Sequence, residues 1–199
     1  MKKMINLAVV AVLAASAGAA FADQGNVQVF DMGEFKLHVY NSMDAMYDAS
    51  YIIESKTGLV TMEEPLFKVN VKEFNDYLAK LNKKVVTRVA DFHLGGTFDK
   101  PITMASGMGA FVKGPVYDGM MKSFAQSFGD KIVSIPTGKV SEVAFNAPQN
   151  WAGVVYTFTK GSATDFPAAN IIIGGKVYYT HWAPMKMHGN HLQLGSRAA

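Results

Sequence analysis

The chain alternates apolar and polar residues at 27–30 and 35–40, and this period of two is typical of strands that bury one face. His38 falls on the polar phase, so we expect it to face solvent. Later runs rich in β-branched and aromatic residues indicate further strands. These runs lie at 50–54, 59–62, 101–106, 131–135, 140–145, 154–158, 169–173 and 176–180, and another begins at 85.

Helical spacing replaces this alternation in two places. In 70–84 the apolar residues share one face, with Asn70 placed to cap the helix and Glu73 three residues on. The spacing of 116–128 predicts a second helix, whereas the glycines of 107–114 and the tail from 183 predict irregular structure. Strands and helices in this order favour an α+β fold, a sandwich of two sheets flanked by helices.

The first 22 residues have the pattern of a secretory signal peptide. Lys2 and Lys3 precede an apolar stretch, and Ala20-Phe21-Ala22 is a small-x-small cleavage site. No later apolar run approaches the length of a membrane span. We therefore expect cleavage after Ala22, a single domain over 23–199, and an exported protein in a bacterial periplasm.

Charge and cysteine content narrow the chemistry. Loss of Lys2 and Lys3 lowers the count of Lys and Arg from 19 to 17 against 16 acidic residues, which leaves a net charge near +1. No basic cluster suggests a nucleic-acid partner. The absence of cysteine excludes disulfides, a cysteine nucleophile and Cys-based zinc or iron–sulfur sites.

The stretch from Thr87 to Gly96, TRVADFHLGG, follows an apolar run and ends in two glycines. It resembles the signature loop of the metallo-β-lactamase superfamily, Thr-His-x-His-x-Asp-His-x-Gly-Gly. Thr87, His93 and both glycines match, while Arg88, Ala90 and Phe92 replace two histidines and the aspartate. The resemblance implies an αββα sandwich of that type, shortened at its C-terminus.

Two later segments are similar to the family's remaining ligand motifs. The resemblance places Ser162 where the family has a histidine, and Trp182, after His181, where it has a bridging aspartate. Most zinc ligands are thus replaced. The first interpretation is a non-catalytic protein without a cofactor that binds a small molecule or an unidentified partner in the inherited cleft. Candidate contacts in that cleft are Arg88, Phe92, Ser162 and Trp182.

Two alternatives stay open. Asp91, His93 and His181 offer two imidazoles and a carboxylate, which suits a remodelled mononuclear metal site, such as zinc, in a hydrolase. The tail offers soft and borderline ligands that suit copper, namely Met185, Met187, His188 and His191. Arg88 beside Asp91 reads as an ion pair, and either Glu63 or Glu64 stands where the family has an acidic residue at a strand end.

Overall fold

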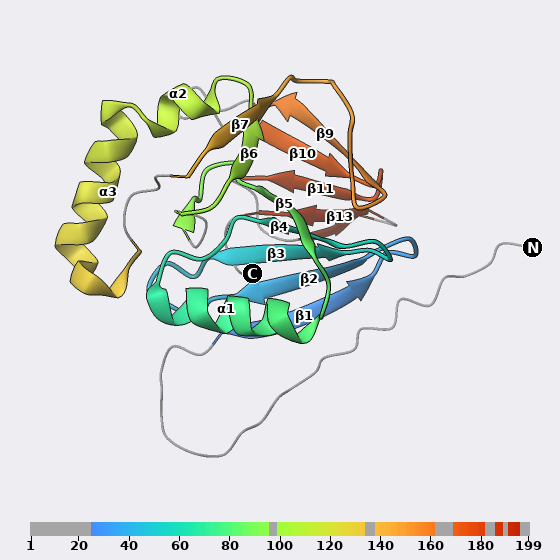
Figure 1. The fold of residues 1–199 in the computed structure, drawn as a ribbon, viewed down its shortest axis with the longest axis horizontal. Coiled ribbons are helices and arrows are strands. Elements are labelled where there is room, and N and C mark those ends of the chain that lie inside the picture. Colours follow the sequence, from blue (N-terminus) through green and yellow to red (C-terminus); the bar gives the residue numbers. More distant parts are fainter. Residues whose placement is uncertain are drawn as a thin grey trace, which may run out of the picture.

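The computed structural model describes residues 25–95, 99–133, 138–161, 169–181, 186–188 and 191–195, with only the backbone described for 186–188. Its first sheet has seven strands in sequence order (Figure 1). They are β1 Asn26–Asp31, β2 Lys36–Asn41, β3 Ala49–Glu54, β4 Leu59–Met62, β5 Val85–Val89, β6 Ile102–Ala105 and β7 Val140–Val143. The strands pair antiparallel up to β4 and parallel from β4 to β7.

The second sheet has six strands in the order β12-β13-β11-β10-β9-β8. They are β8 Gln149–Trp151, β9 Val154–Lys160, β10 Ala169–Ile173, β11 Val177–Thr180, β12 Lys186–His188 and β13 His191–Leu194. The prediction of an irregular tail is wrong, because β13 pairs parallel with β11 and antiparallel with β12. The tail therefore extends the sheet, and Gly189-Asn190 between the two strands is a two-residue turn signal that the prediction did not use.

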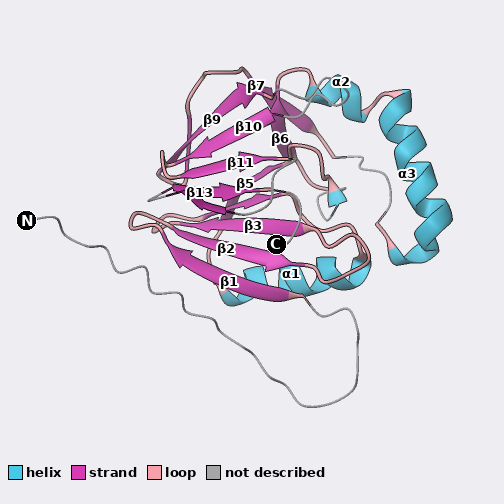
Figure 2. Ribbon diagram, turned by 180° about the vertical axis from the view of Figure 1, so that it is seen from behind, coloured by secondary structure: helices cyan, strands magenta, loops and turns pink. Residues whose placement is uncertain are grey.

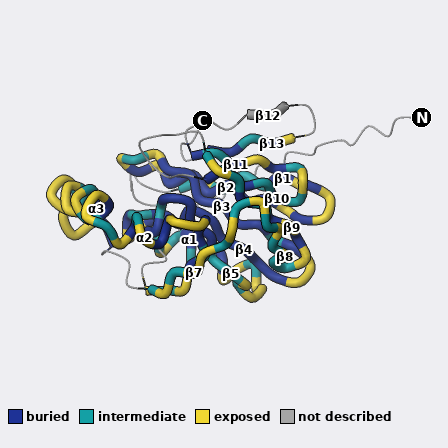
Figure 3. The backbone as a smooth tube through the Cα atoms, turned by 90° about the horizontal axis from the view of Figure 1, so that it is seen from above, coloured by how far each residue is buried: buried dark blue, intermediate teal, exposed yellow. Residues whose placement is uncertain are grey.

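Two hydrophobic clusters hold these layers together. The larger lies between the sheets and includes Met62, Val89 and Phe158. The smaller lies under helix α1 (Lys68–Lys80), where Phe74 and Leu78 pack on Ile52 of β3. Figures 1 and 2 show α1 along the outer face of the first sheet. Buried residues, drawn dark blue, accordingly concentrate in the central strands (Figure 3).

The helices differ in detail from the predicted ones. Helix α1 begins at Lys68 and not at Asn70, whose buried amide donates to the Tyr40 hydroxyl and the Ser42 carbonyl instead of capping the helix. The predicted loop of 107–114 contains a short helix, α2, and a longer α3 follows it, with a one-turn 3-10 helix η2 after that. Their bounds are Met108–Val112, Pro115–Phe128 and Gly129–Lys131.

His38 is buried beneath α1, contrary to the prediction of a solvent-facing side chain. Its Nδ1 lies 2.7 Å from the Tyr77 hydroxyl and its Nε2 lies 3.0 Å from a carboxylate oxygen of Glu54. Lys83 donates to the other oxygen of Glu54 at 2.7 Å. A polar position on a strand thus faces inward because a helix covers it.

The sequence predicted no membrane span after the signal peptide, and it predicted a signal peptide over residues 1–22. Within the described part of the chain, no helix has the length and apolar character needed to cross a membrane. The expected signal peptide lies outside the described residues.

Candidate metal centre

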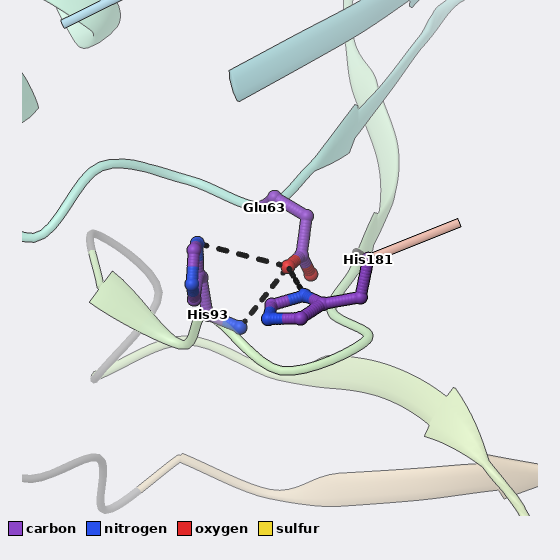
Figure 4. Close-up of side chains that lie close together, drawn as sticks. All are labelled: Glu63, His93 and His181. Atoms are coloured by element: carbon purple, nitrogen blue, oxygen red, sulfur yellow. Dashed lines mark hydrogen bonds and ion pairs between the residues drawn. The ribbon is translucent and has the colours of Figure 1, made fainter. Parts of the chain in front are cut away.

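The ends of β4 and β5 lie side by side, because Met62 pairs with Val89 in a parallel register. Glu63 follows β4 directly, and the loop carrying His93 follows β5. His181 comes from the other sheet, directly after β11. Parallel neighbours end at the same edge of a sheet, which brings Glu63 and His93 together. His181 meets them there from the second sheet, so the three side chains converge (Figure 4).

Glu63 organises the loop after β5. One carboxylate oxygen accepts a very short hydrogen bond from the backbone N–H of Asp91. The other accepts the N–H of His93 at 3.2 Å and the Tyr179 hydroxyl at 3.1 Å, and the N–H of Phe92 is shared between both oxygens. Glu63 itself has a left-handed backbone with φ of 54°, a conformation that costs energy and often occurs at functional sites.

The two imidazoles approach the same carboxylate oxygen. Oε2 of Glu63 lies 3.8 Å from His93 Nδ1 and 3.9 Å from His181 Nδ1. One potential ligand atom from each of the three residues lies within 4.8 Å of the other two. The rings of His93 and His181 meet edge to face at 5.1 Å. The His93 side chain is 22% exposed while Glu63 and His181 are buried, so the group is open to solvent on the His93 side.

Burial keeps His181 neutral. Desolvation is the largest effect and lowers the pKa of His181 to about 4, with Glu63 opposing the shift and His93 adding to it. A neutral imidazole has one nitrogen with a free lone pair, as a metal ligand needs.

Asp91 is buried and joins the group from one side. Its Oδ1 accepts the N–H of Ala169 at 2.6 Å, at the start of β10. Its Oδ2 has no hydrogen-bond partner among the described residues and lies 4.0 Å from His181 Nδ1. Burial, then the charge of Glu63, raises the pKa of Asp91 well above its usual range. Asp91 therefore links the loop after β5 to the second sheet through a buried hydrogen bond.

Phe92 replaces the family's aspartate with an apolar ring. It packs against His181 at 5.0 Å and His93 at 5.9 Å between ring centroids. Its ring centroid also lies 6.0 Å from that of Phe111 and 5.9 Å from that of Tyr117. An aromatic side chain thus fills the space beside the two histidines.

Arg88 does not pair with Asp91 as predicted. Its Nε lies 3.3 Å from Glu64, which also accepts the Thr61 hydroxyl at 2.6 Å. Arg88 pairs with Thr61 across β4 and β5, while the next pair, Met62 and Val89, points into the core between the sheets. Alternation along a strand therefore directs Arg88 away from the histidines, and of the two glutamates Glu63 faces them.

Most of the other predicted site residues lie outside the part of the chain that the structure describes. Ser162, Trp182 and Met185 lie outside the described residues, as do the side chains of Met187 and His188. The backbone of His188 pairs with that of His191 across β12 and β13, and His191 is exposed. Tyr179, which contacts both Glu63 and His181, was not predicted as a site residue, because the sequence shows only that it and Tyr178 occupy alternate positions on a strand.

No family model matches the chain, and no curated protein matches it. Solved structures do. A flavo di-iron protein variant from Thermotoga maritima matches at a TM-score of 0.51 and 14% identity, over 79% of this chain and 42% of that one. The sec-alkyl sulfatase PisA1 matches at 0.54 and 18%, over 72% and 30%. The FEZ-1 metallo-β-lactamase from Legionella gormanii matches at 0.45 and 14%, over 68% and 53%.

The chain spans less than half the length of the first two proteins. Likeness at such identity establishes the fold alone. The fold is the metallo-β-lactamase sandwich that the signature loop implied, with two mixed sheets and helices outside them. The di-zinc centre of the metallo-β-lactamase signature loop does not fit these residues, because Arg88 points away from the histidines and Phe92 supplies a ring in place of a carboxylate.

Proposed function

We propose that this chain, which has the metallo-β-lactamase fold, binds one divalent transition-metal ion through His93, His181 and Glu63. The observation that carries the proposal is their convergence from three separate segments, with one ligand atom of each within 4.8 Å of the others. Bonds to zinc measure about 2.0–2.3 Å, so shifts of under about 1 Å bring the three atoms to bonding distance. Two imidazoles and a carboxylate are a donor set that suits zinc.

The site takes one ion and not two. Phe92 lies against both histidines and offers no ligand atom on that side. Asp91 has an unpartnered oxygen, counting the described residues only, but it approaches His181 and not the whole group. The centre is therefore a rebuilt mononuclear site in which Glu63, at the end of β4, supplies the carboxylate.

Hydrolysis of an ester or phosphoester is the activity we propose for this centre. Three protein ligands leave a coordination position open, as in catalytic rather than structural zinc sites. When bound, the ion supplies Lewis-acid polarisation of the substrate and a lowered pKa for a coordinated water. The chain contributes a carboxylate fixed by three backbone N–H groups and a histidine whose exposed face admits substrate. Export to the periplasm belongs to this proposal, on the pattern of residues 1–22.

The test is a zinc titration of the chelator-treated protein by calorimetry, with His93→Ala, His181→Ala and His38→Gln beside the unmodified chain. The proposal predicts one ion per chain, a loss of affinity by two orders of magnitude or more in the first two variants, and no change in the third. Ester and phosphoester substrates are then assayed with zinc loaded. No zinc uptake would overturn the proposal and return the chain to a metal-free binding protein on this scaffold.

A further inference from the structure

Tyr179 is a buried residue that contacts both His181 and Glu63. Its hydroxyl donates to Glu63 Oε2 at 3.1 Å and lies 3.3 Å from His181 Nδ1. The side chain is completely buried. Tyr179 lies in β11, the strand that ends directly before His181, so it is two residues from that histidine in the chain.

The hydroxyl has a single proton, and this fixes the roles of its neighbours. The Glu63 carboxylate takes part in these contacts only as an acceptor, since three backbone N–H groups and the tyrosine point at it. The Tyr179 proton therefore goes to Glu63. The remaining contact, to His181, is a hydrogen bond only if Nδ1 carries a proton and donates it to the phenolic oxygen.

The surroundings of His181 Nδ1 agree with this assignment. Three oxygen atoms face it, from Tyr179 at 3.3 Å, Glu63 at 3.9 Å and Asp91 at 4.0 Å. The nearest of the three, the Tyr179 oxygen, directs its own proton to Glu63 and can therefore only accept from Nδ1, which favours a nitrogen that bears hydrogen. In the neutral ring, Nε2 then holds the lone pair.

We propose that Tyr179 is a positioning residue that holds His181 in the Nδ1–H tautomer and so makes Nε2 the metal-binding nitrogen. The inference rests on the proposed function for its metal-binding consequence, while the tautomer itself is a property of the metal-free chain. The chain of hydrogen bonds runs from the His181 ring through Tyr179 to Glu63. Tyr179 is thus an outer-shell partner that orients the ligating His181, and its own hydroxyl is oriented by Glu63, the carboxylate of the same site.

Packing holds the phenol in this place. The Tyr179 ring meets Tyr51 edge to face at 5.9 Å, and the Tyr51 hydroxyl makes a very short hydrogen bond to the carbonyl of Gly195 after β13. On the neighbouring strands, Tyr179 pairs in register with Ile171 and Leu194. These neighbours restrict the Tyr179 ring to one orientation.

The experiment is long-range ¹H–¹⁵N NMR of the histidine rings in chelator-treated protein, with His181 signals identified by their loss in His181→Gln. Tyr179→Phe removes only the hydroxyl. Tyr156→Phe is the matched control, because it deletes another fully buried phenol oxygen that has no hydrogen-bond partner among the described residues. Cooperative thermal unfolding confirms that each variant folds.

We expect His181 to be protonated at Nδ1 in the unmodified chain and in Tyr156→Phe, and to be a mixture of tautomers in Tyr179→Phe. Zinc affinity should fall about 10- to 100-fold in Tyr179→Phe, the usual effect of losing an outer-shell partner, and zinc should shift the Nε2 signal of His181. A His181 protonated at Nε2, or a tautomer unchanged in Tyr179→Phe, would overturn the inference. If the tautomer follows Tyr179 but zinc does not bind, the positioning role stands and the proposed function fails.

Discussion

The molecule combines a histidine, a glutamate and a tyrosine in two places, with opposite results. Beneath α1, His38 contacts Glu54 and Tyr77 directly, at 3.0 and 2.7 Å. At the sheet edge, the two histidines lie 3.8 and 3.9 Å from Glu63, too far for a hydrogen bond. The same residue types form a closed network in one case and an open group in the other.

The cause of the difference lies in what satisfies each carboxylate. Glu54 is bound by a side-chain ammonium, Lys83, and by the His38 ring. Glu63 is bound by backbone N–H groups and Tyr179, which leaves the imidazole contacts loose. Both ring nitrogens of His38 have partners, so it has no nitrogen to offer an ion. A buried histidine whose two ring nitrogens both have hydrogen-bond partners is therefore a poor candidate for a metal ligand.

The largest effect should follow from breaking the open group at its carboxylate. Glu63→Gln sets an NH₂ group against backbone N–H donors, and we expect a loss of about 4 kcal/mol in the free energy of unfolding as several buried donors lose their acceptor. Urea unfolding measures this loss. The control is Glu64→Gln, where burial raises the pKa of the glutamate and we expect about 1 kcal/mol. Equal losses in both variants would mean that Glu63 does not organise the loop.

Breaking the closed network should cost less and leave the metal site untouched. His38→Gln loses the link between Tyr77 and Glu54, and we expect a loss of about 2 kcal/mol in stability. Zinc affinity should stay unchanged. His191→Gln, at an exposed position, is the control and should change stability by under about 0.5 kcal/mol. A fall in zinc affinity in His38→Gln would remove the distinction between the two regions.

The closed network around His38 should also affect how the stability of the protein depends on pH. Burial is the main cause that lowers the pKa of His38 below 6.5, and the nearby charges of Lys36 and Lys83 add to it against Glu54. The unfolded chain therefore gains a proton first as pH falls. The stability from neutral His38 is complete above pH 6.5 and is lost as pH falls through 6.5 toward the folded pKa. Denaturation of the chelator-treated protein at pH values from about 7.5 to about 5, on both sides of the usual histidine pKa, measures this loss.

His38→Gln should flatten that curve, and the difference between the two curves isolates His38 from other groups that titrate in the same range. A variant curve parallel to the original would contradict the assignment of the effect to His38.

The smallest effect is expected at Arg88. The side chain of Arg88 is 22% exposed, and its buried partner Glu64 keeps the hydrogen bond from Thr61 when Arg88 is removed. Burial raises the pKa of Glu64, so its carboxylate can take up a proton when the cation is lost, and we expect Arg88→Met to change stability by about 1 kcal/mol. Zinc affinity should not change, because Arg88 points away from the histidines. Loss of zinc binding in this variant would place Arg88 in the cleft, as the signature loop alone suggested.

Part of this arrangement follows from sequence and part does not. The order of hairpin, helix and strand, with the Gly-Gly motif behind His93, was sufficient to predict the fold. The strand of His181 was also predictable, from its Gly-Gly hairpin with 169–173. These signals are local, since they depend on periodicity and turn residues a few positions apart.

The rest depends on contacts between segments far apart in the chain. The pairing of β4 with β5 decides that Glu63 meets the loop and that Glu64 pairs with Arg88. His38 and Tyr179 are covered by elements that their own strands do not encode. These are α1 for His38 and the first sheet, through Tyr51 and Glu63, for Tyr179. Alternation along a strand tells which residues share a face, but it does not tell what covers that face.

A crystal structure of the zinc-loaded protein, with anomalous scattering at the zinc edge, would show whether His93, His181 and Glu63 together hold one metal ion. We expect a single peak at the sheet edge, within about 2.0–2.3 Å of a ligand atom of each residue, and on the Nε2 side of His181. A peak absent from this edge, a pair of peaks there, or zinc bound only at His188 and His191 would contradict it.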